Sequence, residues 1–205
     1  NDEASMKAAV DAGVAREGAV GVLINNAGYS QSGAVEAVPM AKVRAQFETN
    51  VFGLVRLTQL ALPGMRAQRW GKVVNLSSMG GRLTFPGGGY YHATKYAVEA
   101  LSDALRLEVA PFGVDVVLVE PGLIRTEFGS TASHGLAGTT DGSAYGGLLR
   151  YADELMAKAY TSRAAVGPEK VAEVITDVVE ADRTQPRYVV TAAAKAQVHT
   201  RRLLG

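Results

Sequence analysis

A run of apolar residues that ends in a turn recurs four times along this chain, and it restricts the fold more than any other feature. The runs are "VGVLINNAG" (20–28), "KVVNLSS" (72–78), "VDVVLVEPG" (114–122) and "RYVVTA" (187–192). Consecutive rather than alternate apolar residues are typical of strands buried on both faces of a parallel sheet. Stretches long enough for helices separate the runs, so the sequence predicts a doubly wound parallel sheet in three α/β/α layers.

The intervals between these runs carry helical periodicity. Apolar residues recur at helical spacing in four stretches: residues 5–16, 39–68, 90–110 and 168–181. Proline can open a helix, but inside one it removes a backbone hydrogen bond. We therefore predict that the second stretch begins at Pro39 and is broken or bent at Pro63 and Gly64.

Charge and composition exclude several classes of function. The chain has 21 basic and 20 acidic residues and no basic patch, so we expect no nucleic-acid partner and no anionic membrane surface. It has no cysteine and its three histidines are scattered, so we expect no metal site. No apolar stretch reaches about 18 residues and the first residues lack a signal-peptide pattern, so a cytoplasmic protein is expected.

Residues 127–167 depart from the alternation of strands and helices. They are rich in Gly, Ser, Thr and Ala, and only residues 148–159 carry a modest helical pattern. A connection of this length inside a compact domain usually has a function. We predict a single domain over residues 1–205 in which residues 127–167 form a substrate-binding lid. A surface insertion without function is the alternative.

Polar residues follow the first three apolar runs. In doubly wound sheets, ligands bind at the carboxyl ends of the strands, where this chain has "NNAG", "LSS" and "EPG". Further along, Tyr91 and Lys95 are four positions apart on a predicted helix and therefore share one of its faces. Taken alone, each of these features has a structural explanation, such as a turn, a strand-end hydroxyl or an exposed helix pair.

Taken together and in this order, the motifs resemble those of the short-chain dehydrogenase/reductase family. The matching elements are "NNAG" at 25–28, Asn50 in "NVFG", Ser78 in "NLSS", "YHATK" at 91–95 and "PGLIRT" at 121–126. Ser78 precedes Tyr91 by thirteen residues, the interval that this family uses. The resemblance extends over nearly the whole chain, is greatest to the hydroxysteroid dehydrogenase-like subgroup, and implies a Rossmann-like fold.

The resemblance assigns catalytic roles to Asn50, Ser78, Tyr91 and Lys95. Tyr91 would be the general acid/base for the proton on the substrate oxygen, and Ser78 would hold that oxygen. Free tyrosine has a pKa near 10, but an ammonium about 4 Å away would stabilise the phenolate by roughly 4 kcal/mol at an effective dielectric of 20. We therefore expect Lys95 to lower the pKa of Tyr91. Asn50 would kink its helix and hold a water that passes protons from Lys95 to solvent.

The implied cofactor is NAD(P)(H), and the subgroup resemblance favours NADP. The residues expected to bind it are Asn26, Ala27, Gly28, Tyr91, Lys95, Pro121, Gly122, Ile124 and Thr126. The family's TGxxxGxG turn, which seats the pyrophosphate at a helix N-terminus, has no match in the sequence. We therefore expect the chain to be N-terminally truncated, without its first strand-helix-strand unit. The apolar strand at 20–28 would then need a cover at the sheet edge.

The sequence thus predicts an NAD(P)-dependent oxidoreductase that interconverts a secondary alcohol and a ketone as its small-molecule substrates. A catalytically silent protein with a binding or regulatory role is the alternative, and an isomerase or dehydratase of the extended branch ranks third. A hydrophobic substrate is suggested by the apolar residues Phe85, Phe128, Leu136, Tyr145, Leu148, Leu149 and Met156. We expect His92 to be a surface or wall residue rather than a catalytic one, and His134 is a weaker candidate for substrate contact.

The predicted helix 90–110 is apolar on more than one side. Its apolar residues include Tyr96, Val98, Leu101, Leu105 and Leu107. A helix that is apolar nearly all round must be buried on both faces. One face can cover the sheet, and we expect the other, with helix 39–68, to pack against a second copy in a homodimer or homotetramer.

Overall fold

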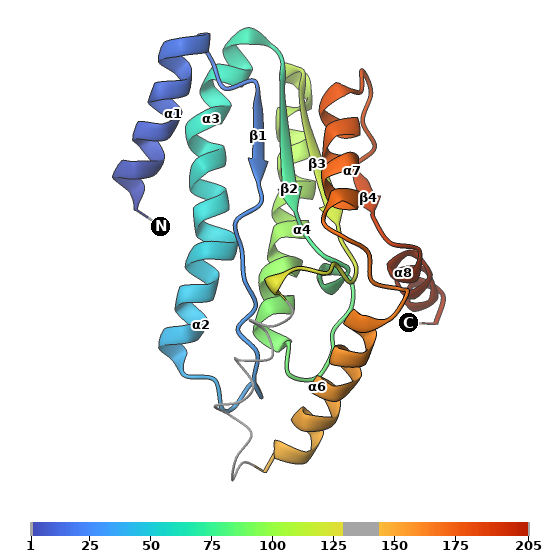
Figure 1. Cartoon of the computed structure of the whole chain (residues 1–205). Coiled ribbons are helices and arrows are strands. Elements are labelled where there is room, and N and C mark those ends of the chain that lie inside the picture. The colour runs from blue at the N-terminus through green and yellow to red at the C-terminus, as the bar shows by residue number, and fades with distance from the viewer. Residues whose placement is uncertain (1, 129–143, 205) are drawn as a thin grey trace.

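The computed structural model describes residues 2–128 and 144–204 of the chain (Figure 1). Four parallel strands form one sheet in the order β1 (Val22–Asn25), β2 (Gly71–Leu76), β3 (Val114–Glu120) and β4 (Arg187–Val189). The principal helices are α1 (Glu3–Glu17), α2 (Met40–Phe47), α3 (Leu54–Gln68), α4 (Gly89–Val109), α6 (Gly146–Thr161), α7 (Glu169–Glu180) and α8 (Ala192–Leu204). The parallel sheet and its alternation with helices confirm the predicted doubly wound α/β class.

Neighbouring residues of the central strand face opposite helical layers. Val73 of β2 packs with Met65 of α3 and Val109 of α4, whereas Val74 packs with Val178 of α7. Figure 1 shows α1 and α3 side by side next to β1, with α7 toward the other end of the sheet. Both faces of β2 and β3 are therefore covered, which explains why these strands are apolar at consecutive positions.

The predicted helix 39–68 contains a π-helical turn. This turn, Glu48–Gly53, separates α2 from α3 and includes Asn50, the residue at which the family resemblance implies a kink. Turns of this kind are rare and frequently lie at functional sites. The other three predicted helices agree with α1, α4 and α7 to within two residues at each end.

Pro63 lies inside α3 without ending it. The helix continues to Gln68, so a break at Pro63 and Gly64 was wrong, whereas a bend there stays a prediction. Gly64 packs closely on the residues before β1, because a Cβ atom on it would lie only 3.2 Å from the Cβ of Ala19. Local propensity is a weak guide where a segment is packed in this way.

A buried lysine fixes α7 on its face of the sheet. Lys72 lies on β2, and its ammonium donates hydrogen bonds to the carbonyls of Val178 (3.0 Å), Val179 (2.7 Å) and Ala181 (2.5 Å). The last carbonyls of a helix have no partner within it, and a cation there complements the negative end of the helix dipole. One side chain thus satisfies the C-terminus of α7 and joins it to the centre of the sheet.

We expect Lys72→Met to lower the free energy of unfolding by about 2–4 kcal/mol, because it leaves buried helix carbonyls without a donor. The methionine keeps most of the apolar stem, so the loss measures the ammonium and its hydrogen bonds. Urea unfolding followed by circular dichroism gives the value. Lys42→Met is the matched control, since Lys42 is exposed on α2 and its loss should cost less than about 0.5 kcal/mol. Equal effects of the two substitutions would contradict the role given to Lys72.

The carboxyl ends of the strands meet at one edge of the sheet, where the site is built (Figure 1). The loops after β1, β2 and β3 leave from this edge with residues 26–32, 77–88 and 121–126. At the side of the described sheet, β1 has one strand neighbour and its Ile24 is 45% exposed. The cover expected for this strand stays a prediction. Among residues 2–128 and 144–204, no helix is long and apolar enough to cross a membrane.

Candidate active site

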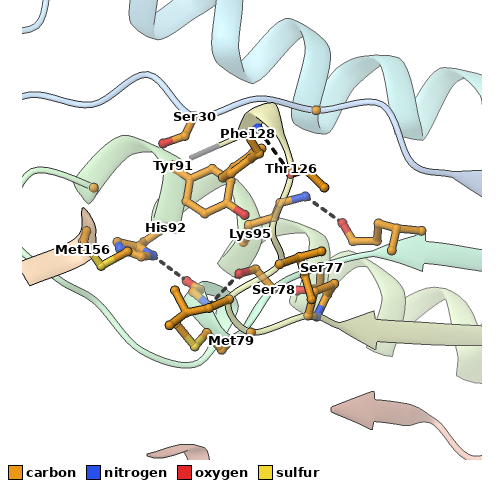
Figure 2. Close-up of a pocket in the computed structure, with 18 of the residues that line it drawn as sticks. Ser30, Ser77, Ser78, Met79, Tyr91, His92, Lys95, Thr126, Phe128 and Met156 are labelled. Atoms are coloured by element: carbon orange, nitrogen blue, oxygen red, sulfur yellow. Dashed lines mark hydrogen bonds between the residues drawn. The ribbon is translucent and has the colours of Figure 1, made fainter. Parts of the chain in front are cut away.

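A cavity of about 520 Å³ opens at the carboxyl edge of the sheet. Its walls come from the three loops that follow β1, β2 and β3, from the start of α4, and from α6 and α7. Figure 2 shows Ser78, Tyr91 and Lys95 beside one another in this cavity, with the Tyr91 hydroxyl directed toward the other two. The structure therefore brings together three of the four residues predicted to be catalytic, and Asn50 lies behind the cavity wall.

Ser78 is held at the end of β2 by a tight turn. Its extended backbone leads into the 3₁₀ turn Met79–Gly81, and the amide of Gly80 donates a 3.0 Å hydrogen bond to its Oγ atom. The Ser78 side chain also acts on Tyr91, whose pKa it lowers. The hydroxyl is thus fixed from the protein side while it lines the cavity.

Tyr91 lies in an environment that favours the neutral phenol. Burial raises its pKa above the usual value, the hydrogen bond with Ser78 lowers it, and Tyr160 raises it further. The ring also contacts Phe128, with centroids 5.4 Å apart. The expected lowering of the Tyr91 pKa was therefore wrong, because loss of water around the hydroxyl outweighs the lowering by Ser78.

Lys95 is buried on α4, one turn after Tyr91. Its ammonium donates a 2.7 Å hydrogen bond to the carbonyl of Leu76 and lies 5.8 Å from the centroid of the Tyr91 ring. Burial lowers the pKa of Lys95 to about 8, and the negative charge of Glu99 opposes that shift. Lys95 is therefore charged at neutral pH and loses its charge as the pH rises through about 8.

Asn50 joins the π-helical turn to two other parts of the site. Its amide group donates to the Tyr29 carbonyl (2.9 Å) and to Thr94 Oγ1 (3.0 Å), and its oxygen accepts from the Tyr29 amide (3.0 Å). Thr94 in turn donates to the Tyr91 carbonyl. Asn50 thus ties the loop after β1 to α4. The proton relay through a held water stays a prediction.

His92 has a larger part in the site than the sequence indicated. It is buried, and its Nδ1 atom lies 3.0 Å from the carbonyl of Gly80, so Nδ1 carries the proton. Gly80 also holds Ser78, through its own amide. The imidazole also makes an edge contact with the Tyr91 ring at 5.6 Å. His92 lines the cavity as predicted, but it also supports both Ser78 and Tyr91.

Most of the predicted cofactor residues line the cavity. Those that do are Asn26, Gly28, Tyr91, Lys95, Pro121, Gly122, Ile124 and Thr126, whereas Ala27 is exposed beside it. Gly122 has a packing reason to be glycine, because an added Cβ would overlap Thr191 Oγ1 at 2.2 Å. The small side chains here therefore serve the protein's own packing as well as any ligand.

The donor set at this end of the cavity fits a nicotinamide nucleotide. A Cβ atom on Gly28 would lie 3.7 Å from the Lys95 ammonium and 3.2 Å from Asn50 Oδ1, so glycine keeps the space beside these groups open. Among the described residues, Lys95 uses one hydrogen bond, to Leu76, and an ammonium has three donors. The remaining donors suit the hydroxyls of a ribose.

The apolar wall is composed differently from the prediction. Phe85, Phe128 and Met156 line the cavity, but Leu148 is 52% exposed. Leu149 packs on Ala34, and the Tyr145 hydroxyl donates to Glu36. Leu136 and His134 lie outside the described residues. The wall residues that the sequence did not indicate come from other elements: Leu123, Tyr160, Val171 and Ile175.

The structure places Ser78, Tyr91 and Lys95 at the carboxyl edge of a doubly wound parallel sheet, which is where α/β enzymes bind their ligands. Comparison with known proteins specifies the family, since the profile described as short chain dehydrogenase matches residues 1–137. The chain belongs to the short-chain dehydrogenase/reductase family and is an oxidoreductase of that kind. The comparison favours an enzyme over the catalytically silent alternative.

Three similar proteins illustrate the relationship. The chain is 35% identical over 195 residues to the "Uncharacterized oxidoreductase SPAC977.08" of Schizosaccharomyces pombe, covering 92% of this chain and 77% of that protein. It is 38% identical over 176 residues to the NADPH-dependent 3-dehydrocapnine reductase of Ornithobacterium rhinotracheale, covering 82% and 60%. A solved short-chain dehydrogenase from Streptomyces avermitilis superposes with a TM-score of 0.80 at 35% identity, covering 98% and 71%.

Proposed function

We propose that the protein is an NAD(P)-dependent oxidoreductase that interconverts a ketone and a secondary alcohol on a hydrophobic substrate, with Tyr91 as the general acid/base. The observation that carries the proposal is the convergence of Ser78, Tyr91 and Lys95 at one end of a largely apolar cavity. The family's members named above as oxidoreductases or reductases support it.

NADP(H) is the proposed cofactor, because the similar 3-dehydrocapnine reductase is named as NADPH-dependent. Lys95 would hold its ribose hydroxyls, and Gly28, Pro121 and Ile124 would contact it. When bound, the nicotinamide supplies or accepts a hydride. Isothermal titration with NADPH and with NADH tests the preference, and tighter binding of NADH would contradict it.

The chain's own residues would supply the proton, orient the substrate oxygen and stabilise the charge left on the donor. Burial keeps Tyr91 protonated at neutral pH, so it can donate a proton to a ketone oxygen. Ser78, held by Gly80, would donate a hydrogen bond to the same oxygen and orient it. Lys95 would stabilise the negative charge that develops on the Tyr91 oxygen as the proton leaves. These roles favour ketone reduction.

The substrate is proposed to carry a long apolar group. The cavity surface is mainly carbon, with Phe85, Phe128, Met156 and Ile175 among its walls. In a series of unbranched methyl ketones, kcat/KM should rise by about fourfold per added methylene, at about 0.8 kcal/mol each, until the cavity is filled. Initial rates with NADPH across the series measure this. A kcat/KM that is flat, or highest for short hydrophilic ketones, would contradict the hydrophobic substrate.

Two further features are proposed in the same terms. Residues 127–167 would act as the substrate lid, and the support is that α6 within this range contributes Met156 and Tyr160 to the cavity. We also propose a homodimer or homotetramer. The support is that three large apolar side chains of α4 are exposed: Tyr96 (38%), Leu101 (43%) and Leu107 (80%). Sedimentation of a monomer at micromolar concentration would contradict the second proposal.

A further inference from the structure

Two buried carboxylates lie together behind the cavity. Glu99 of α4 is 6% exposed, and Glu120, the last residue of β3, is 0% exposed. One nitrogen atom joins them, because Nε of Arg187 lies 3.0 Å from Glu99 Oε2 and 3.3 Å from Glu120 Oε1. Neither carboxylate lines the cavity, and the roles proposed above use neither of them.

The cations around this pair also serve other groups. Arg82, in the loop after β2, lies 3.3 Å from Glu120 Oε1 but is partly exposed to solvent. Arg187 of β4 also binds Asp103 of α4, and Asp103 binds Arg106. The two buried carboxylates therefore share positive charge that is divided with Asp103 and screened by water.

One oxygen of each carboxylate is buried without a hydrogen-bond partner among the described residues. These atoms are Oε1 of Glu99 and Oε2 of Glu120. The Oγ atom of Ser77 is likewise buried without a hydrogen-bond partner among the described residues. A Cβ atom on Gly81 would lie 2.7 Å from Ser77 Oγ and 3.0 Å from Glu99 Cγ, so Ser77 and Glu99 both lie against Gly81. A buried ionised carboxylate with an unpaired oxygen is costly, and two neighbouring ones cannot both ionise easily. One proton on the pair would relieve both costs.

Glu99 is also linked to the proposed catalytic lysine. It lies four residues after Lys95 on α4, which places the two side chains on one face of the helix. Burial tends to neutralise Lys95, and the Glu99 charge acts against this. The hydrogen bond to the Leu76 carbonyl and the contact with the Tyr91 ring also favour the ammonium.

We propose that Glu99 and Glu120 share a single proton, and that Glu99 is a positioning residue whose negative charge keeps Lys95 an ammonium beside Tyr91. The catalytic meaning of Glu99 rests on the proposed function, whereas the shared proton does not. Burial first and Glu99 second raise the pKa of Glu120 from 4.5 to about 7, against the opposing effects of Arg82 and Arg187. The pair thus holds its proton at pH 6 and releases it as the pH rises through about 7.

Infrared difference spectroscopy of the intact chain between about pH 6 and about pH 8.5 tests the shared proton. We expect a carbonyl band of a protonated, buried carboxylic acid at the lower pH, lost at the higher pH and absent in Glu120→Gln. Glu108→Gln is the matched control, because Glu108 is exposed on α4 and its substitution should leave the band unchanged. No band in the wild-type protein, or the same band in Glu120→Gln, would overturn the proposal.

NMR titration of the side-chain ¹³Cε of Lys95, assigned with Lys95→Arg, tests the second part. We expect Glu99→Gln to lower the pKa of Lys95 by about one to two units, because one nearby negative charge is lost. Glu108→Gln should leave it unchanged. An unchanged Lys95 titration in a folded Glu99→Gln variant would overturn the positioning role. Glu120→Gln removes the other carboxylate of the pair, and the Lys95 pKa in that variant should be unchanged or higher.

Neither measurement requires turnover, so the two proposals fail separately. The expected infrared band and Lys95 shift in a protein that reduces no ketone would leave the acid pair intact and overturn the proposed function. In an active enzyme, the pH at which kcat is lost on the alkaline side should fall in Glu99→Gln by the same one to two units, about as much as the Lys95 titration. An unmoved alkaline limb would overturn the link from Glu99 to catalysis.

Discussion

Tyr91→Phe is expected to lower turnover by about 10³–10⁴-fold, because the substitution removes the hydroxyl beside Ser78 that we propose as the proton donor to the substrate oxygen. The phenylalanine ring keeps the contacts with Phe128 and His92, so the cavity should keep its shape. Steady-state kcat with a ketone and NADPH measures the loss, and calorimetry should give a cofactor affinity within about threefold of wild type.

Tyr90→Phe is the matched control for this experiment. Tyr90 is the preceding residue on α4, and its hydroxyl donates to the Val35 carbonyl rather than facing Ser78. Its loss should change kcat by less than about threefold, since it removes a partly exposed hydrogen bond. If Tyr91→Phe retained wild-type turnover, or if both variants lost activity equally, the acid/base role of Tyr91 would be wrong.

Lys95→Met is expected to have the second-largest effect, a loss of about a hundredfold in kcat. At the 5.8 Å between its ammonium and the Tyr91 ring centroid, a full charge contributes roughly 3 kcal/mol at an effective dielectric of 20. The wild-type enzyme should lose activity as the pH rises through about 8, where Lys95 loses its proton. The variant, which has no proton to lose there, should show no such limb.

The pH profile of kcat separates this role from a general loss of structure. Lys95→Arg keeps a positive charge that does not titrate in this range, and its profile should also lack the limb at about pH 8 while retaining more activity than Lys95→Met. A Lys95→Met enzyme that still loses activity at about pH 8 would show that another group causes the limb.

The fold could be predicted because its strongest signals are local in the sequence. Apolar runs such as residues 72–78 and 114–122 are buried on both faces, and a parallel sheet is the structure that satisfies them. The continuity of the helix through Pro63 was not predicted, because the local signal of a proline-glycine pair does not include tertiary contacts such as that of Gly64 with Ala19. Helix propensity is a property of the local sequence, whereas tertiary packing determines the conformation that the segment adopts.

The residues of the candidate site could be predicted where they belong to motifs in the sequence. Contacts between side chains from different elements could not. Ser78, Tyr91 and Lys95 could be identified from the resemblance of their motifs to those of the family. The raised pKa of Tyr91 could not, because the spacing gives the distance to Lys95 but not the loss of water around the hydroxyl. The sequence indicated a wall position for His92 but not its contact with the Gly80 carbonyl, twelve residues earlier.

The imidazole of His92 also restricts what two glycines can become. A Cβ atom on Gly80 would lie 2.5 Å from its Nδ1, and one on Gly88 would lie 2.6 Å from its Nε2. Alanine at either position therefore collides with a ring that packing holds in place. Once a smaller residue replaces His92, both positions gain room for a methyl group. Positions 80, 88 and 92 should consequently change together in the evolution of this chain, with larger residues at the first two accompanying smaller ones at the third.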